Sequence, residues 1–172
     1  AKWTWNKCFT YPKSKRQVLE GLRHYDVVDG LLPSVTTILS DTKSEEKIKK
    51  LAEWRARVGQ DEATRITDQS GQRGTIMHNY LEGYLKGQNR LDLSPVGVVA
   101  GGMATKVMED GVFDKLTEIW GSEVVVFYPG LYAGQTDVVG IYEGEQSIVD
   151  FKQSNKPKKR EWIDEYFMQS AA

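Results

Sequence analysis

The stretch TDVVGIYEGEQSIVDFKQ, residues 136–153, constrains the fold of this 172-residue chain more than any other. Two runs rich in β-branched residues flank a short segment that contains glycine, which is the pattern of two antiparallel strands joined by a tight turn. The first run carries Asp137, and the second ends in Asp150-Phe151-Lys152. The pattern therefore predicts a hairpin that places two carboxylates and one ammonium group near one end of a sheet.

The segments around this hairpin predict the rest of the secondary structure. The run EVVVFY, 123–128, is expected as a further strand, so that 123–128, 131–142 and 147–152 form a three-strand meander. Apolar residues at helical spacing predict helices from 44 to 58 and, in two pieces, from 61 to 87. The segment 98–121 is expected as one interrupted helix or two. Ser34 and Ser44 are suited to cap helix starts, and Gly59 is suited to end a helix.

The final segment, 161–172, is predicted as a helix whose apolar residues face inward. These residues are Trp162, Ile163, Tyr166 and Phe167. The ending EYFMQSAA is typical of a helix interior without a stop signal, so we expect the last part of the domain to be incomplete.

The order of elements predicts an α/β chain of α+β character, with a central mixed sheet that contains the meander and is flanked by helices. Its length favours a single domain over 1–172. Within that domain we expect an N-terminal arm over about 1–43, a helical part over 44–120 and a core over 121–172.

The composition excludes several classes of protein. No apolar run approaches the roughly 18 residues of a membrane span, and no cleavable signal pattern opens the chain. The single cysteine, Cys8, excludes an internal disulfide framework and a cysteine-based metal site. A net charge of −1 gives no overall basic excess. We therefore expect an intracellular protein with no membrane partner.

The charged groups of the hairpin predict a chemistry. Two carboxylates held close together repel each other unless a cation lies between them. A hard divalent ion with oxygen ligands removes that repulsion, and Asp137, Asp150 and Lys152 without cysteine favour Mg²⁺ or Mn²⁺ over structural zinc. The expected reaction is metal-assisted hydrolysis of a phosphodiester. Alone, however, a D-x-K tripeptide is more often a solvated strand end or a simple ion pair.

Four motifs in order resemble a known family. The pair GQTDVVG and IVDFKQS resembles the PD-(D/E)xK nuclease superfamily, and RGTIMHNYLEGYL is similar to the G-T-x-x-H helix motif of its RecB-like branch. LPSVTTIL and YFMQSAA resemble segments of the mitochondrial genome maintenance exonuclease group and its phage relatives. In that branch a glutamine precedes a tyrosine by four residues; Gln169 matches the glutamine, and the chain stops at Ala172.

The resemblance implies roles for individual residues. Asp137 and Asp150 would be metal ligands, with the backbone carbonyl of Phe151 and the side chain of His78 as further ligands. Lys152 would be the catalytic lysine. The implied fold is a restriction-endonuclease-like core with a helical region over the site, and the implied activity is processing of DNA ends, on single strands.

Other polar residues are candidates to support the site. Glu82 shares a helix face with His78 and is suited either to orient it or to form an ordinary surface pair. Glu123 opens a predicted strand, where a solvated carboxylate is the simpler interpretation. Gln135 has the same strand parity as Asp137 but lies one pleat away.

Candidates for substrate binding are mainly basic. Arg73 is suited to clamp a phosphate with two parallel hydrogen bonds. The basic run after the predicted catalytic strand would attract a polyanion in a salt-dependent way. Gln169 is suited to contact substrate or to cap a helix face. The candidate members of the basic run are Lys156, Lys158 and Lys159.

Three functions fit these residues. The first is a metal-dependent exonuclease acting on DNA with free ends, which is the function that the full set of motifs favours. The second is a catalytically silent DNA-binding module on the same scaffold, and the third is a metal-dependent hydrolase of nucleotides. The sequence leaves the oligomeric state and the polarity of digestion open.

Overall fold

The computed structural model of the protein describes residues 2–172. It divides into two compact units. The first contains the chain up to Thr42 and again from Phe113 onward, and the second contains Lys43–Val112.

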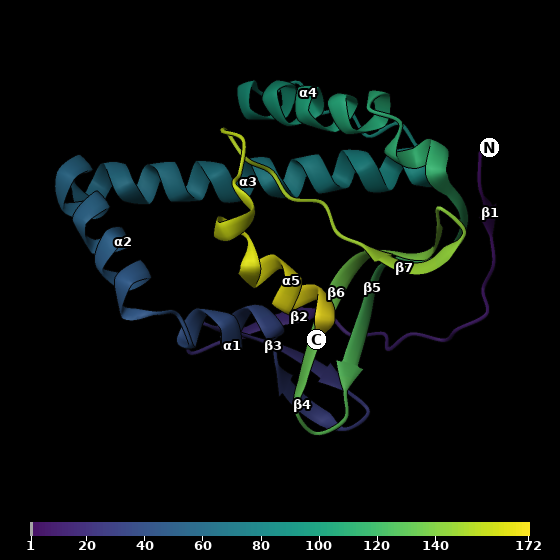
Figure 1. Ribbon diagram of the computed structural model, residues 1–172, viewed down its shortest axis with the longest axis horizontal. Helices are drawn as coiled ribbons and strands as arrows, with labels where there is room; N and C mark the ends of the chain where they lie inside the picture. Colours follow the sequence, from purple (N-terminus) through teal and green to yellow (C-terminus); the bar gives the residue numbers. More distant parts are fainter. Residues whose placement is uncertain (1) are drawn as a thin grey trace. The chain divides into compact units, whose positions relative to one another are not determined.

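A four-stranded mixed sheet forms the centre of the first unit. Its strand order is β1-β5-β6-β7, with β1 parallel to β5 and the other pairs antiparallel (Figure 1). The predicted three-strand meander and the predicted mixed sheet are therefore confirmed. The strands are β1 (Thr4–Trp5), β5 (Leu116–Tyr128), β6 (Tyr132–Tyr142) and β7 (Glu145–Val149).

Strand β5 begins earlier than the sequence predicts. The segment 116–121 was expected to be helical, but it forms the first half of β5 and pairs with the end of β6. Leu116 and Ile119 are buried there, at 3% and 0% exposure. Their three-residue spacing is also helical, which explains the wrong prediction; an irregular register in this part of β5 keeps both side chains in the core.

A second, smaller sheet of three antiparallel strands belongs to the same unit. It comprises β2 (Arg16–Leu19), β3 (Leu22–Val27) and β4 (Gly30–Pro33), and it is followed by helix α1 (Val35–Asp41). Ser34 caps α1 as predicted, because its hydroxyl accepts a hydrogen bond from the Thr37 amide at 3.0 Å. A buried cluster joins this sheet to β5 and β6: Tyr25, Val27, Leu32, Val125 and Ala133.

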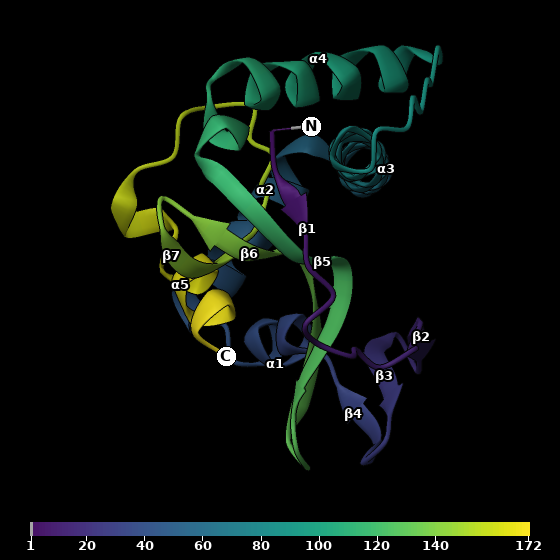
Figure 2. The same ribbon diagram turned by 90° about the vertical axis from the view of Figure 1, so that its right-hand side faces the viewer.

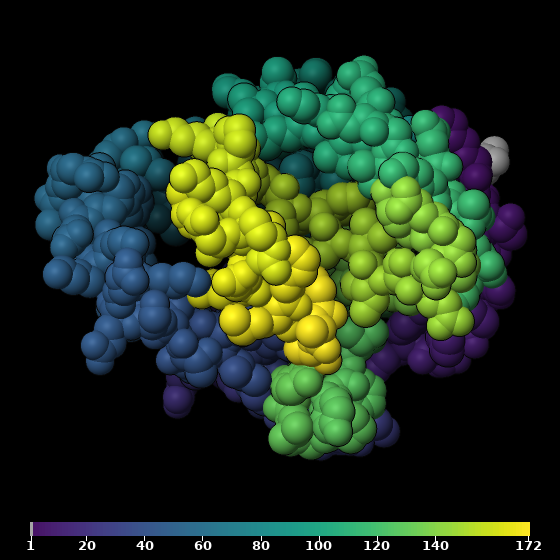
Figure 3. All heavy atoms as spheres, viewed as in Figure 1, coloured from purple at the N-terminus to yellow at the C-terminus, as the bar shows by residue number. Residues whose placement is uncertain are grey.

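The C-terminal segment of the first unit contains a 3₁₀ turn, η2 (Arg160–Trp162), and helix α5 (Asp164–Ala171). This segment lies at the surface in the space-filling view (Figure 3). Trp162 and Phe167 are 55% and 50% exposed, so the prediction that they face inward is wrong. Both rings instead lie under cations: Lys159 Nζ is 5.3 Å from the Trp162 centroid, and the Arg160 guanidinium is 4.0 Å from that of Phe167.

The second unit is helical. It consists of α2 (Glu45–Val58), α3 (Gln60–Leu85) and α4 (Pro95–Glu109), with a short 3₁₀ turn, η1 (Val112–Lys115), where the chain passes back into the first unit. Helices α3 and α4 contact each other, and α4 lies above α3 in both ribbon views (Figures 1 and 2). Among residues 2–172, no helix combines the length and the apolar composition that a membrane span requires.

The sequence predicts the start and end of α2 correctly. Ser44 accepts a hydrogen bond from the Lys47 amide at 3.4 Å, and Gly59 ends the helix with φ of 88°. The segment from 60 to 85 is one continuous helix rather than the two pieces expected. Met77, Leu81 and Leu85 supply its buried stripe, which the helical spacing predicts.

Gly140 lies where β5 and β6 approach each other too closely for a side chain to fit, so its substitution measures how tightly the two strands pack. A Cβ atom at this position would lie 2.0 Å from the carbonyl oxygen of Glu118. Because that oxygen belongs to the backbone, Gly140→Ala should lower the free energy of unfolding by about 2–3 kcal/mol. Gly134→Ala on the same strand is the control, since its Cβ would be 3.8 Å from the nearest atom. Its effect should stay within about 1 kcal/mol. Equal effects in urea unfolding would contradict this packing.

Candidate metal site on the sheet

The register of the β6–β7 hairpin places Asp137 opposite Asp150. The strands are joined by the two-residue turn Glu143-Gly144, and both residues have positive φ, 51° and 84°. A turn of this kind matches the twist of the strands and fixes their pairing. The pairing runs from Tyr142 with Glu145 to Val138 with Val149. Asp137 and Asp150 are the next residues on the two chains beyond this last pair, and the Phe151 amide donates a hydrogen bond to Asp137 Oδ2, which keeps the two segments together.

The pairing of β5 with β6 adds a third carboxylate to the same line. Ser122 lies opposite Val138, and Val124 lies opposite Thr136, so Glu123 falls opposite Asp137. A carboxylate oxygen of Glu123 and one of Asp137 lie within 4.8 Å of each other. Residues directly opposite in antiparallel strands are neighbours on one face. Glu123 on β5, Asp137 on β6 and Asp150, the first residue after β7, therefore follow one another across this part of the sheet, and we call these three residues the acidic row.

Asp137 is the most buried member of the acidic row. It is 8% exposed, and its Oδ2 accepts a hydrogen bond from the Phe151 amide at 2.6 Å. A buried carboxylate requires such donors, because it has lost its contact with water. The sequence predicts a strand that continues to Lys152, but β7 ends at Val149, and two residues later the Phe151 amide donates to the side chain of Asp137.

Lys152 lies next to Asp150, as the sequence motif predicts, but not because both share a strand face. The two residues follow the end of β7, and the Lys152 ammonium is 2.6 Å from Asp150 Oδ2. Both side chains are partly exposed, at 34% for Lys152 and 22% for Asp150. The ammonium also lies 5.5 Å from the ring centroid of Tyr166 on α5. Lys152 is thus held between a carboxylate and an aromatic ring.

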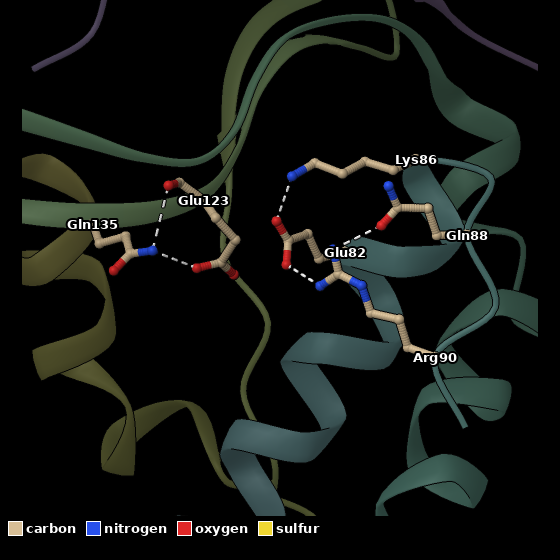
Figure 4. Close-up of polar contacts among 6 residues, drawn as sticks. All are labelled: Glu82, Lys86, Gln88, Arg90, Glu123 and Gln135. Carbon is tan, nitrogen blue, oxygen red and sulfur yellow. Dashed lines mark hydrogen bonds and ion pairs between the residues drawn. The ribbon is translucent and has the colours of Figure 1, made fainter. Parts of the chain in front are cut away.

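Glu123 has an unusual backbone conformation for a residue inside a strand. Its φ is 53°, in the left-handed region that residues with a Cβ seldom adopt. The sequence pattern predicts a strand start at this residue, where a solvated carboxylate would be ordinary. The structure places it in the middle of β5, within reach of Gln135 (Figure 4). The sequence pattern does not indicate that Glu123 lies inside a strand, because that depends on β5 beginning at Leu116.

Two of the predicted site residues, His78 and Arg73, lie on α3 in the second unit. Both are partly buried, and His78 follows the buried Met77. Their parts in metal and phosphate binding stay predictions.

Glu82, one turn beyond His78, is engaged by two cations of its own unit. Its two carboxylate oxygens accept hydrogen bonds from Lys86 and from Arg90 (Figure 4). The side chain is 15% exposed. Burial raises the pKa of the Glu82 carboxyl, but the hydrogen bonds and positive charges of Lys86 and Arg90 outweigh it, so that the pKa lies below its ordinary value.

Apart from Arg73, the residues predicted to bind substrate lie in and around the C-terminal segment of the first unit. Lys156, Lys158 and Lys159 are exposed in the loop between β7 and η2, and Gln169 is partly buried on α5. The loop follows directly after Lys152, so its positive charges belong to the same unit as the acidic row.

Comparison with known proteins relates the chain to nucleases. It is 27% identical over 133 residues to mitochondrial genome maintenance exonuclease 1 of Homo sapiens, and 30% identical over 135 residues to that of Mus musculus. Each match covers 74% of this chain but 38% of the relative, so the chain spans well under half of these proteins. No protein-family model matches the chain. The similarity is weak, and it supports a nuclease as the class of protein.

The Glu82 carboxyl should make the stability of the fold depend on pH in a defined direction, and its replacement should remove that dependence. A carboxyl whose folded pKa is lowered stabilises the fold fully above its ordinary pKa of 4.5, and loses this effect as pH falls through the folded pKa. Glu82→Gln should therefore lower the free energy of unfolding at neutral pH by about 1 kcal/mol, and the difference should close below pH 4.5.

The matched control is Glu46→Gln. Glu46 pairs with Lys50 at the same four-residue spacing, but both side chains are 70% or more exposed. We expect no measurable change in urea unfolding for this variant, because water screens the pair. Equal losses in the two variants, or a Glu82→Gln effect that persists in acid, would contradict the role given to Glu82.

Proposed function

We propose that this chain is the catalytic part of a divalent-metal-dependent nuclease that hydrolyses phosphodiester bonds at the ends of single-stranded DNA. The observation that carries the proposal is the acidic row with the Lys152 ammonium 2.6 Å from one of its carboxylates. The similarity to two proteins named as exonucleases supports the same class of reaction. We propose that the nuclease acts inside a cell.

The donor set of the acidic row fits Mg²⁺ or Mn²⁺. An oxygen of Glu123 lies within 4.8 Å of one of Asp137, so that the Glu123 carboxylate adds its negative charge beside a proposed ligand. All three side chains offer oxygen, which hard divalent ions prefer. We assign Asp137 and Asp150 as ligands, the Phe151 carbonyl and His78 as further ligands, and Glu123 as a support of the site. A bound ion would supply Lewis-acid activation of water and of the phosphate.

The residues of the chain would contribute separate steps. The Phe151 amide donates a hydrogen bond to Asp137 and so holds its carboxylate in one orientation at the middle of the row, where it would bind the ion. Lys152 would place its positive charge beside the phosphate, where negative charge increases during the reaction. Arg73, Gln169 and the loop lysines would hold the substrate through its backbone. Glu82 would help to keep His78 oriented through their shared helix.

The unpaired bases of a single strand distinguish it from a duplex. Trp162 and Phe167 are exposed next to the basic loop and lie under cations. Proteins that bind single strands combine such positive charge with aromatic rings on which bases stack. This combination favours a single strand as the substrate in the proposal.

The proposal predicts that Lys152→Ala reduces cleavage of end-labelled linear single-stranded DNA by about 100-fold or more, because a preorganised positive charge is lost from the reacting phosphate. Cleavage should require Mg²⁺ or Mn²⁺ and stop with EDTA. A circular single strand should resist cleavage, because the proposed enzyme acts at ends. The rate is measured under single-turnover conditions.

Lys115→Ala provides a closely matched control. Lys115 also pairs with a carboxylate, that of Glu143, and lies 5.9 Å from a tyrosine ring centroid, that of Tyr142. It has no part in the acidic row, so its replacement should leave the rate within about 2-fold, as for most surface substitutions. Full activity of Lys152→Ala would contradict the proposed site. DNA binding without any cleavage by the unaltered chain would favour a silent binding module, and cleavage confined to mononucleotides would favour a nucleotide hydrolase.

A further inference from the structure

Gln135 makes two hydrogen bonds to one residue of the acidic row. Its Nε2 donates to the Glu123 carboxylate oxygen Oε2 at 2.6 Å and to the Glu123 backbone carbonyl at 3.3 Å (Figure 4). Gln135 lies two residues before Asp137 on β6, so both side chains leave the same face. It pairs with Val125, which makes Glu123 its diagonal neighbour on that face.

The two hydrogen bonds from Gln135 meet Glu123 at the point where its backbone leaves the regular strand conformation. A φ of 53° takes Glu123 out of the regular strand conformation between Ser122 and Val124, which both pair with β6. The Gln135 carboxamide binds the backbone and the side chain of Glu123 together. One carboxamide thus contacts both the backbone and the carboxylate of Glu123 where the strand conformation is irregular.

We propose that Gln135 is a positioning residue that holds the Glu123 carboxylate beside Asp137 and thereby raises the affinity of the acidic row for a divalent cation. The inference rests on the proposed function of the row as a metal site. Hydrogen-bond partners that orient ligating groups commonly increase metal affinity, because the groups no longer have to be ordered when the ion binds.

The chemical nature of the side chain supports this assignment. A carboxamide donates hydrogen bonds without carrying a charge, so Glu123 keeps its negative charge for the cation. A lysine or arginine in place of Gln135 would position the same carboxylate but would also neutralise it and repel a divalent ion. Glutamine therefore suits a position that must orient an anion and leave it attractive to metal.

The test is calorimetric titration of the full chain with Mn²⁺ in the absence of DNA. Gln135→Leu should weaken Mn²⁺ binding by roughly 10-fold, as is typical when a partner of a metal-binding group is removed. Gln146→Leu is the matched control: Gln146 is exposed on β7 opposite Ile141, away from the acidic row, and its replacement should leave binding unchanged. Gln135→Thr, too short to reach Glu123, serves as the second variant if the leucine variant does not fold.

A double-mutant cycle separates positioning from general damage. In a Glu123→Gln background, the Gln135→Leu substitution should change Mn²⁺ affinity by less than about 2-fold, because no carboxylate remains to be positioned. Weakening of the same size in both backgrounds would overturn the inference. So would unchanged binding by Gln135→Leu when the unaltered chain binds Mn²⁺. Absence of Mn²⁺ binding by the unaltered chain would overturn the proposed metal function itself, and this inference with it.

Discussion

Antiparallel pairing between β5, β6 and β7 is the constraint on which the candidate site depends. Because strand side chains alternate between faces, a slip of one residue would send Asp137 to the other side of the sheet. The Glu143-Gly144 turn, with positive φ at both positions, holds β6 and β7 in the register that aligns Asp137 with Asp150. The pairing of β5 with β6 then aligns Glu123 with Asp137. The acidic row is a consequence of these two registers.

Each carboxylate of the row has a donor of a different kind. Asp137 accepts from the Phe151 amide, Asp150 pairs with the Lys152 ammonium, and Glu123 accepts from the Gln135 carboxamide. Three neighbouring negative charges repel one another; the amide and the carboxamide hold Asp137 and Glu123 without neutralising them, and the Lys152 ammonium offsets the charge of Asp150. Such an arrangement is stable enough to fold and still attractive to a divalent cation, which agrees with the proposed nuclease function.

Local sequence patterns predict the parts of the structure that local interactions decide. The alternating apolar runs and the glycine-containing turn predict the hairpin, and Ser34, Ser44 and Gly59 are correctly predicted to cap or end helices. The same patterns predict that Asp137, Asp150 and Lys152 come together; the structure places Asp137 in the middle of β6 rather than at an end of the sheet, and Asp150 and Lys152 directly after β7. The predicted roles of these residues in catalysis remain predictions.

Features that depend on tertiary contacts were not predictable in this way. The three-residue spacing of Leu116 and Ile119 fits a helix as well as an irregular strand. The segment is a strand because it pairs with β6. Trp162 and Phe167 are apolar at helical spacing, yet they are exposed under basic side chains. The bond from Gln135 to Glu123 joins two strands, so no local pattern indicates it.

The sharpest test of the acidic row as a metal site is a crystal structure of this chain grown with Mn²⁺, with the metal located by its anomalous scattering. We expect an anomalous peak at the acidic row, with carboxylate oxygens of Asp137 and Asp150 about 2.0–2.6 Å from the ion. The loss of that peak in Asp137→Asn crystals would confirm the ligand. A fully occupied Mn²⁺ position elsewhere, with none at the acidic row, would show that the sheet register does not build a metal site.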